Sequence, residues 1–271
     1  MLLTRLYSAF IGIVLLAIVM GAPGIYMNIA LTLISLVGLH ELYRAFRQAG
    51  LKPIAWFGYL STIVVLFSDR ISLEKGKMYL LAAVFAVILL LCTNLVLSKG
   101  KLNFIDVSIT IFSILYIPFL LSFIGFTRKM DNGVVFVWLT LIGGWVTDTM
   151  AYFSGRFLGK NKLIPSISPK KTIEGAIGGV LGCTLIIFLY GIIVLNKYYH
   201  INIAPINFVI MGIILSVAAQ FGDLTASSIK RAAKIKDFGT IMPGHGGVID
   251  RFDSILFVAP IVYFYLQFLG Y

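Results

Sequence analysis

Long, continuously apolar runs are the feature that most constrains this chain. Of its 271 residues, 59% are hydrophobic and 12% are charged, whereas soluble globular domains are about 45–50% apolar and about 25% charged. A helix that crosses the roughly 30 Å hydrocarbon core of a bilayer needs about 20 apolar residues. Nine windows of that kind are present: 5–21, 24–40, 53–68, 78–98, 104–126, 133–152, 175–196, 204–222 and 252–270. None alternates polar and apolar residues in blocks of about ten, so helices are favoured over a barrel. The sequence predicts an all-α integral membrane protein with about nine transmembrane helices.

The distribution of Lys and Arg predicts how such a chain is oriented. With the N-terminus inside, sixteen of the 22 Lys and Arg residues fall on the inner side and six on the outer side. Cytoplasmic loops carry this excess, so we expect a cytoplasmic N-terminus and an outside C-terminus. Topology and attraction to the anionic lipid bilayer then explain the net charge of +11, with no nucleic acid as partner. The first run resembles a signal peptide, but eight further runs favour an uncleaved helix. A bacterial inner membrane is the expected location, with the endoplasmic reticulum as the alternative.

The residues that suggest chemistry gather in the second half of the chain. We read residues 1–130 as scaffold and lipid-access helices, whose charges, such as Glu41 with Arg44, are solvated helix ends and local pairs. Residues 131–271 are read as a catalytic region with two cytoplasmic polar loops. Six of the 11 acids lie beside or between the last four apolar runs: Asp148, Glu174, Asp223, Asp237, Asp250 and Asp253.

Four of these aspartates are candidate metal ligands. Asp148 lies within an apolar run and Asp223 ends one, and a carboxylate in that setting costs several kcal/mol unless it is compensated. Asp250 and Asp253 are three residues apart, so a helix would place both on one face. Mg²⁺ prefers one or two carboxylates together with substrate phosphates, and Asp223 with Asp250 or Asp253 could hold it. The alternatives are helix-locking ion pairs for the first two aspartates and helix capping for the last two.

The two polar loops carry candidate phosphate-binding groups. In the later loop the glycines allow backbone N–H groups to approach an anion; they are Gly244, Gly246 and Gly247. His245 lies among them and could donate a hydrogen bond to a phosphate or shuttle a proton, although a plain linker remains an alternative. Nearby cations would compensate phosphate charge; they are Lys230, Arg231 and Lys236.

The earlier loop places hydroxyl groups beside two lysines. Its candidate substrate-binding residues are Ser168, Lys170, Lys171 and Thr172. The glycines that follow have small-xxx-small spacings, which favour close helix packing over ligand binding; they are Gly175, Gly178, Gly179 and Gly182. The same spacings leave a homodimer open.

The motifs of residues 227–253 resemble a known family. They read Ser227-x-Ile229-Lys230-Arg231, four further residues, Lys236-Asp237-x-Gly239, and then Pro243-x-His245-Gly246-Gly247-Val248-x-Asp250-Arg251-Phe252-Asp253. This pattern is similar to that of phosphatidate cytidylyltransferases, also called CDP-diacylglycerol synthases. The segments 148–155 and 166–175 are similar to that family too, so the resemblance covers roughly residues 140–260. Met242 departs from the family pattern, which more often has Leu, Ile or Phe at this position, but the change is between apolar residues of similar volume.

The resemblance implies transfer of CMP from CTP to phosphatidic acid, giving CDP-diacylglycerol and pyrophosphate. It implies Mg²⁺ as the cofactor and leaves a second cation open. It implies Asp223 and Asp250 as metal ligands, with Asp253 and Asp148 auxiliary. The implied catalytic residues are Asp223, Lys230, Arg231, Lys236, Asp237, His245, Asp250, Arg251 and Asp253. A CTP-dependent polyprenol or lipid kinase is the alternative within enzymes, and a transporter of a phosphorylated metabolite is the alternative outside them.

Overall fold

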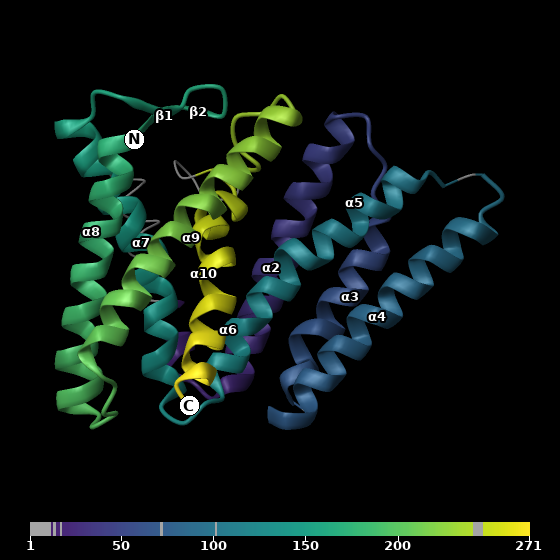
Figure 1. Cartoon of the computed structure of the whole chain (residues 1–271). Coiled ribbons are helices and arrows are strands. Elements are labelled where there is room, and N and C mark those ends of the chain that lie inside the picture. Colours follow the sequence, from purple (N-terminus) through teal and green to yellow (C-terminus); the bar gives the residue numbers. More distant parts are fainter. Residues whose placement is uncertain (1–11, 13–14, 17, 71–72, 101, 241–245) are drawn as a thin grey trace. The chain divides into compact units, whose positions relative to one another are not determined.

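The computed structural model describes residues 12, 15–16, 18–70, 73–100, 102–240 and 246–271. These residues are mostly helical (Figure 1) and divide into two compact units. The first unit comprises the described residues of 1–129 together with Lys230–Arg251, and the second comprises Met130–Ile229 with Phe252–Tyr271.

The first unit is built from apolar helices that begin with α2 (Gly24–Gln48) and α3 (Ala55–Phe67). A short 3₁₀ turn, η1 (Ser68–Arg70), precedes α4 (Leu73–Leu97). The next helical run consists of α5 (Phe104–Ile114), the π-helical segment η2 (Leu115–Phe119) and α6 (Leu120–Arg128). Pro118 lies inside η2, where a proline removes a backbone donor and so favours a local change of helix type.

The second unit starts with α7 (Gly133–Leu158) and a hairpin of β1 (Lys162–Ile164) and β2 (Ser168–Thr172). The strands are antiparallel, with Lys162 opposite Thr172, and this small sheet is an addition to the predicted all-α fold. It leads into α8 (Ile173–Tyr190), the π-helical η3 (Gly191–Tyr198) and α9 (Pro205–Ala232), and α10 spans Ile249–Phe268. Figure 1 shows the hairpin at the end of α8 where that helix begins.

Glycines bring α7 and α8 into close contact. A Cβ atom added to Gly175 would lie 2.8 Å from the carbonyl oxygen of Ala151, and one added to Gly182 would lie 2.5 Å from Met150. Real Cβ contacts are longer, so these positions need glycine for the helices to approach. The prediction of close helix packing is confirmed. Since these glycines face a helix of the same chain, they no longer argue for a homodimer, which stays a prediction without a test.

The described part of the chain contains six helices that are long and apolar enough to cross a membrane, judged by length and composition. They are Gly24–Gln48, Met78–Leu97, Phe104–Arg128, Gly133–Leu158, Ile173–Tyr198 and Pro205–Ala232. The chain is therefore a multi-pass integral membrane protein. Of the other three predicted windows, 5–21 falls mostly outside the described residues, 53–68 forms the 13-residue α3, and 252–270 forms most of α10. The count of nine and the sidedness of the termini remain predictions.

Candidate active site

Two carboxylates of the second unit converge on one buried hydroxyl group. Ser254 Oγ donates to Asp148 Oδ2 at 2.8 Å and lies 3.5 Å from Asp253 Oδ1. The backbone N–H of Ser254 also donates to Asp253 Oδ1, at 2.8 Å. Asp253 and Ser254 are buried, whereas Asp148 is exposed. The hydroxyl group of Ser254 therefore lies near the carboxylates of both Asp148 on α7 and Asp253 on α10. These two acids are 105 positions apart in the sequence.

Glycines explain why three helices of this unit meet there. A Cβ atom on Gly144 of α7 would lie 2.9 Å from the side chain of Ile255, and one on Gly222 of α9 would lie 2.4 Å from the carbonyl oxygen of Asp253. Both positions face the first turns of α10. Gly144 lies one turn before Asp148, and Gly222 immediately precedes Asp223, so the two close contacts fix the backbone next to each acid.

Asp223 is paired with a lysine from the hairpin. Lys171 Nζ lies 2.5 Å from Asp223 Oδ2, and the two side chains are 26% and 27% exposed. Ser227 Oγ, one turn further along α9, lies 3.4 Å from Asp223 Oδ1. Lys171 belongs to β2, the last strand before α8. The structure thus brings the earlier polar loop to one of the predicted metal ligands.

Thr172 has a helix-capping contact. Its Oγ1 accepts a hydrogen bond from the backbone N–H of Gly175 at 3.1 Å, so this predicted substrate-binding residue is the N-cap of α8. Glu174 in the first turn of α8 accepts from both the backbone N–H and the side-chain amide of Asn161. These contacts hold the two ends of the hairpin together and fix the strand that carries Lys171.

The donor set of this unit fits a hard divalent cation. Mg²⁺ is commonly bound by one or two carboxylates, with waters and substrate phosphates completing its octahedral shell, and Asp148 and Asp253 already border a common hydroxyl group. Within the described ranges, no group of three or more His, Cys, Asp or Glu side chains is arranged as a metal site. A cation here would accordingly depend on oxygens supplied by substrate.

The first unit contains a second lysine–aspartate pair, centred on Asp250. Lys230 Nζ lies 2.7 Å from Asp250 Oδ1, with side-chain exposures of 12% and 7%. Asp250 Oδ2 accepts from the backbone N–H groups of Phe238 at 2.9 Å and Gly247 at 3.0 Å. Lys230 Nζ also lies 5.5 Å from the centre of the Phe238 ring. Both carboxylate oxygens of Asp250 thus have donors, and Asp250 connects the end of α9, the following loop and the start of α10.

Gly246 requires glycine for the turn that precedes α10. Its φ is +83°, and an added Cβ atom would lie 3.1 Å from Asp250 Oδ2. A side chain would be strained by the backbone conformation and would crowd the carboxylate. Gly247 is buried beside it. The predicted glycine-rich loop is therefore built around Asp250 in its described part, whereas Gly244 and His245 lie outside the described residues.

Glu41 was expected to be a solvated helix end, and that expectation is wrong. Its residue is 1% exposed, and its two carboxylate oxygens accept from the backbone N–H groups of Val248 and Ile249, each at 3.1 Å. Arg44, its expected partner, donates to the carbonyl oxygen of Phe238. Sequence reasoning missed this pair because its partners lie about 200 positions away. An acid one turn before an arginine, on an otherwise apolar helix, was the available signal.

The remaining predicted site residues are more open to solvent. Ser168 is half-buried in β2. Five predicted residues with charged side chains are exposed: Lys170, Arg231, Lys236, Asp237 and Arg251. Such side chains can reach a polar substrate from outside, but no described contact assigns them a role in catalysis.

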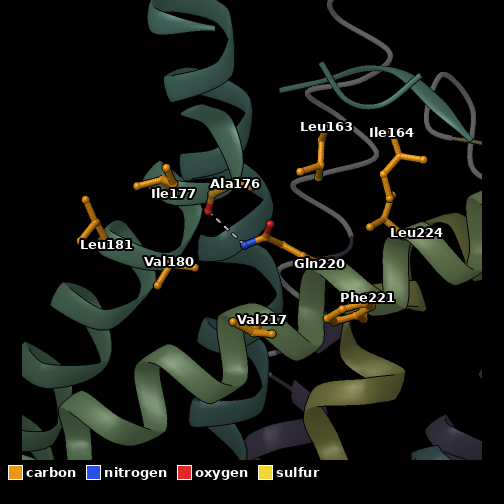
Figure 2. A pocket seen from close by; sticks show the side chains of 10 residues that line it. All are labelled: Leu163, Ile164, Ala176, Ile177, Val180, Leu181, Val217, Gln220, Phe221 and Leu224. Carbon is orange, nitrogen blue, oxygen red and sulfur yellow. Dashed lines mark hydrogen bonds between the residues drawn. The ribbon is translucent and has the colours of Figure 1, made fainter. Parts of the chain in front are cut away.

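An apolar groove of about 440 Å³ lies between α8 and α9 within the second unit. Figure 2 shows Ile177 and Leu181 of α8, Val217 and Phe221 of α9, and Leu163 from the hairpin along its walls. Gln220 is the polar residue among those lining it, and its amide group donates to the carbonyl oxygen of Ala176 at 3.1 Å.

The groove continues along the same two helices. A second groove, of about 500 Å³, shares Val180 and Leu181 with the first and extends to Phe188 and Val209. From Val209 to Leu224 the helix α9 rises about 22 Å, which exceeds half of a bilayer's hydrocarbon core of roughly 30 Å. One end of this apolar surface is at Leu224, next to Asp223 in the chain.

Comparison with known proteins gives a match along nearly the whole chain. The sequence profile of the Cytidylyltransferase family matches residues 3–269. A phosphatidate cytidylyltransferase of Staphylococcus haemolyticus (strain JCSC1435) is 33% identical over 258 residues, which cover 95% of this chain and 96% of that protein. The protein of the same name from Staphylococcus aureus (strain COL) is 31% identical over 262 residues, with the same two coverages.

Proposed function

The chain belongs to the cytidylyltransferase family, and from this premise we propose that it transfers CMP from CTP to phosphatidic acid. The products are CDP-diacylglycerol, a precursor for phospholipid biosynthesis, and pyrophosphate. The observation that carries the proposal is the Lys171–Asp223 pair in the unit where Asp148 and Asp253 converge. Asp148 and Asp223 lie on α7 and α9, which are long and apolar enough to cross a membrane, and Lys171 lies on β2 beside them. This arrangement suits a reaction between a nucleotide and a lipid headgroup.

The transfer needs positioned charge more than proton chemistry. A phosphate oxygen of phosphatidic acid attacks the α-phosphorus of CTP, the new P–O bond forms, and the bond to the bridging oxygen of the β-phosphate breaks. Pyrophosphate leaves with that electron pair. A phosphate monoester is largely ionised at neutral pH because its second pKa is about 6, so the attacking oxygen needs no general base. The protein's contribution is to align the two phosphates and to stabilise the leaving group.

Lysines supply that stabilisation by changing partners. In the described structure the charge of Lys171 is compensated by Asp223 and that of Lys230 by Asp250. A phosphate group competes for either ammonium group, because a charge-assisted hydrogen bond to phosphate is at least as strong as one to a carboxylate. Exposed Lys170, Arg231, Lys236 and Arg251 add positive charge for the nucleotide.

The acids of the second unit supply oxygen ligands for Mg²⁺. Asp148 and Asp253 would hold the ion, and Asp223 would offer a further carboxylate where Lys171 binds a phosphate instead. Asp250 as a metal ligand stays a prediction from the sequence, since its oxygens contact Lys230 and two backbone N–H groups. When bound, Mg²⁺ supplies positive charge that offsets the charge developing on pyrophosphate.

The apolar groove offers a place for an acyl chain of the lipid. Its walls are formed by two membrane-crossing helices, and one end lies at Leu224 beside Asp223. An acyl chain along α8 and α9 would place the lipid phosphate at the level of Lys171. A bacterial inner membrane with the polar loops on the cytoplasmic side completes the proposal, because CTP is a soluble cytoplasmic substrate.

The test is pyrophosphate release by the purified protein in detergent with phosphatidic acid, CTP and Mg²⁺. Omission of lipid and omission of nucleotide serve as controls. Asp253→Asn is compared with Asp131→Asn, because Asp131 belongs neither to the two lysine–aspartate pairs nor to the site of Asp148 and Asp253. Lipid-dependent pyrophosphate and a CDP-lipid product, both strongly reduced at limiting Mg²⁺ in Asp253→Asn alone, support the proposal. CDP with a phosphorylated lipid identifies a CTP-dependent kinase, and flux across sealed vesicles without covalent change identifies a transporter.

A further inference from the structure

We infer that one turn of α2, defined by Glu41 and Arg44, positions Asp250 and Lys230 for the cytidylyl transfer. This turn lies in the half of the chain that the sequence marks as scaffold. The inference rests on the proposed function, because it assigns Lys230 to the nucleotide's phosphates. Glu41 and Arg44 touch no reacting atom in it, and they act as positioning residues through the backbone that surrounds Asp250.

Glu41 holds the start of α10 through both of its carboxylate oxygens. Oε1 accepts from the backbone N–H of Val248 and Oε2 from that of Ile249, each at 3.1 Å. The first N–H groups of a helix have no partner within the helix, so a carboxylate from another helix satisfies them and fixes the direction in which α10 begins. Asp250 is the next residue of that helix.

Arg44 acts on the carboxylate of Asp250 through Phe238. Its guanidinium group donates to the carbonyl oxygen of Phe238, while the backbone N–H of Phe238 donates to Asp250 Oδ2. The two backbone polar groups of one residue are thereby fixed by Arg44 and Asp250. Since Lys230 contacts both the carboxylate of Asp250 and the ring of Phe238, displacement of Phe238 moves the lysine too.

Two glycines leave room for the Glu41 carboxylate. A Cβ atom on Gly239 would meet Glu41 Oε1, and one on Gly247 would lie 2.5 Å from Glu41 Oε2 and 2.6 Å from the backbone nitrogen of Gly239. Both residues are buried. The loop is therefore shaped around a carboxylate from α2, which distinguishes Glu41 from a side chain that merely fills space.

Substitution of Glu41 by glutamine tests the contact directly, because both carboxylate oxygens of Glu41 accept hydrogen bonds from backbone N–H groups. Glu41→Gln preserves volume but replaces one acceptor oxygen with an NH₂ group, which would face a backbone N–H donor. Glu41→Asp keeps both acceptors on a shorter side chain and should recover part of the function. Arg44→Ala removes the donor to Phe238, Arg44→Lys restores one donor, and Arg47→Ala is the matched control because Arg47 lies one turn further along α2 and is exposed.

The kinetic experiment compares these variants well below their unfolding temperatures. Glu41→Gln and Arg44→Ala should raise the KM for CTP by about tenfold or lower kcat to that extent through displacement of the phosphate-binding lysine, while the KM for phosphatidic acid stays within about twofold. Glu41→Asp and Arg44→Lys should have values of KM for CTP and of kcat between those of these variants and those of the wild type. A loss that follows the folded fraction and leaves both KM values and kcat per folded molecule unchanged overturns the inference.

Hydrogen exchange provides a readout that does not depend on activity. Glu41→Gln should speed amide exchange at Val248, Ile249 and Gly247, and Arg44→Ala should speed it at Phe238, while Arg47→Ala matches the wild type. Unchanged exchange at these amides overturns the inference. If the wild type releases no lipid-dependent pyrophosphate, the proposed function fails, and the exchange result alone decides whether the turn of α2 positions Asp250.

Discussion

The two lysine–aspartate pairs differ in burial, which predicts different costs when each lysine is removed. Lys230 and Asp250 are 12% and 7% exposed, whereas Lys171 and Asp223 are 26% and 27% exposed. Methionine is the substitution of choice in both cases, because it keeps an unbranched apolar stem and removes only the charge. Lys230→Met and Lys171→Met therefore form a matched pair.

The expected magnitudes follow from the contacts of each aspartate. Removal of one partner of a buried ion pair costs about 3–5 kcal/mol, since a charge is left uncompensated. Asp250 retains two backbone N–H donors after Lys230→Met, so we expect the lower end, about 3 kcal/mol of unfolding free energy. Exposed pairs contribute about 0–1 kcal/mol, and Lys171→Met should cost about 1 kcal/mol or less because water reaches Asp223.

The assay is reversible unfolding in mixed micelles with increasing SDS, followed by circular dichroism, with pyrophosphate release measured on the same samples. Both variants should lose activity, because both lysines bind phosphates in the proposed mechanism, but Lys230→Met should be the less stable by about 2 kcal/mol. Added salt should reduce the stability difference between Lys171→Met and the wild type more than the difference between Lys230→Met and the wild type, because salt screens exposed charges more than buried ones. Equal stability losses, or a larger loss for Lys171→Met, would refute the argument from burial.

Four further outcomes are expected. Gly222→Ala should cost about 1–3 kcal/mol and lower kcat, because its Cβ would lie 2.4 Å from the carbonyl oxygen of Asp253; unfolding and pyrophosphate release measure both effects. Thr172→Ala should cost about 1 kcal/mol of unfolding free energy through loss of the α8 cap, while Thr172→Ser retains it. Chelation of Mg²⁺ by EDTA should abolish pyrophosphate release, and Asp253→Asn should raise the Mg²⁺ concentration for half-maximal rate by about tenfold in a metal titration. Leu181→Trp should fill the groove and raise the KM for phosphatidic acid by about tenfold while that for CTP is unchanged in initial-rate assays.

The helices were predictable because apolar runs of this length have few alternatives in a membrane protein, but their ends were not. The window 24–40 underestimates α2, which continues to Gln48, and the window 204–222 underestimates α9, which continues to Ala232. The extra residues include Glu, Arg and Lys, which favour helices as strongly as many apolar residues do. Hydrophobicity marks where a helix can lie in lipid, whereas helix propensity and capping determine where it ends.

The candidate site was predictable where its residues are close in sequence. Lys230, Gly247 and Asp250 lie within one motif, and the structure brings them together. Glu41 was not predictable in the same way, because its contacts to Val248 and Ile249 depend on how α2 packs in three dimensions. A single acid on an apolar helix indicates a buried partner but does not say which backbone groups provide it.

Compensated lysines solve a problem that any phosphate-binding site in an apolar protein faces. A buried ammonium group without a counter-ion costs several kcal/mol, so the site cannot keep its cations unpaired until a nucleotide arrives. Lys171 and Lys230 each have an aspartate partner in the described structure, and in the proposed mechanism an arriving phosphate would replace one anion with another. The aspartate that loses its lysine would then offer oxygen ligands to a hard cation. In the second unit this exchange would release Asp223 in the same unit as Asp148 and Asp253, so the binding of phosphate and of cation should each strengthen the other.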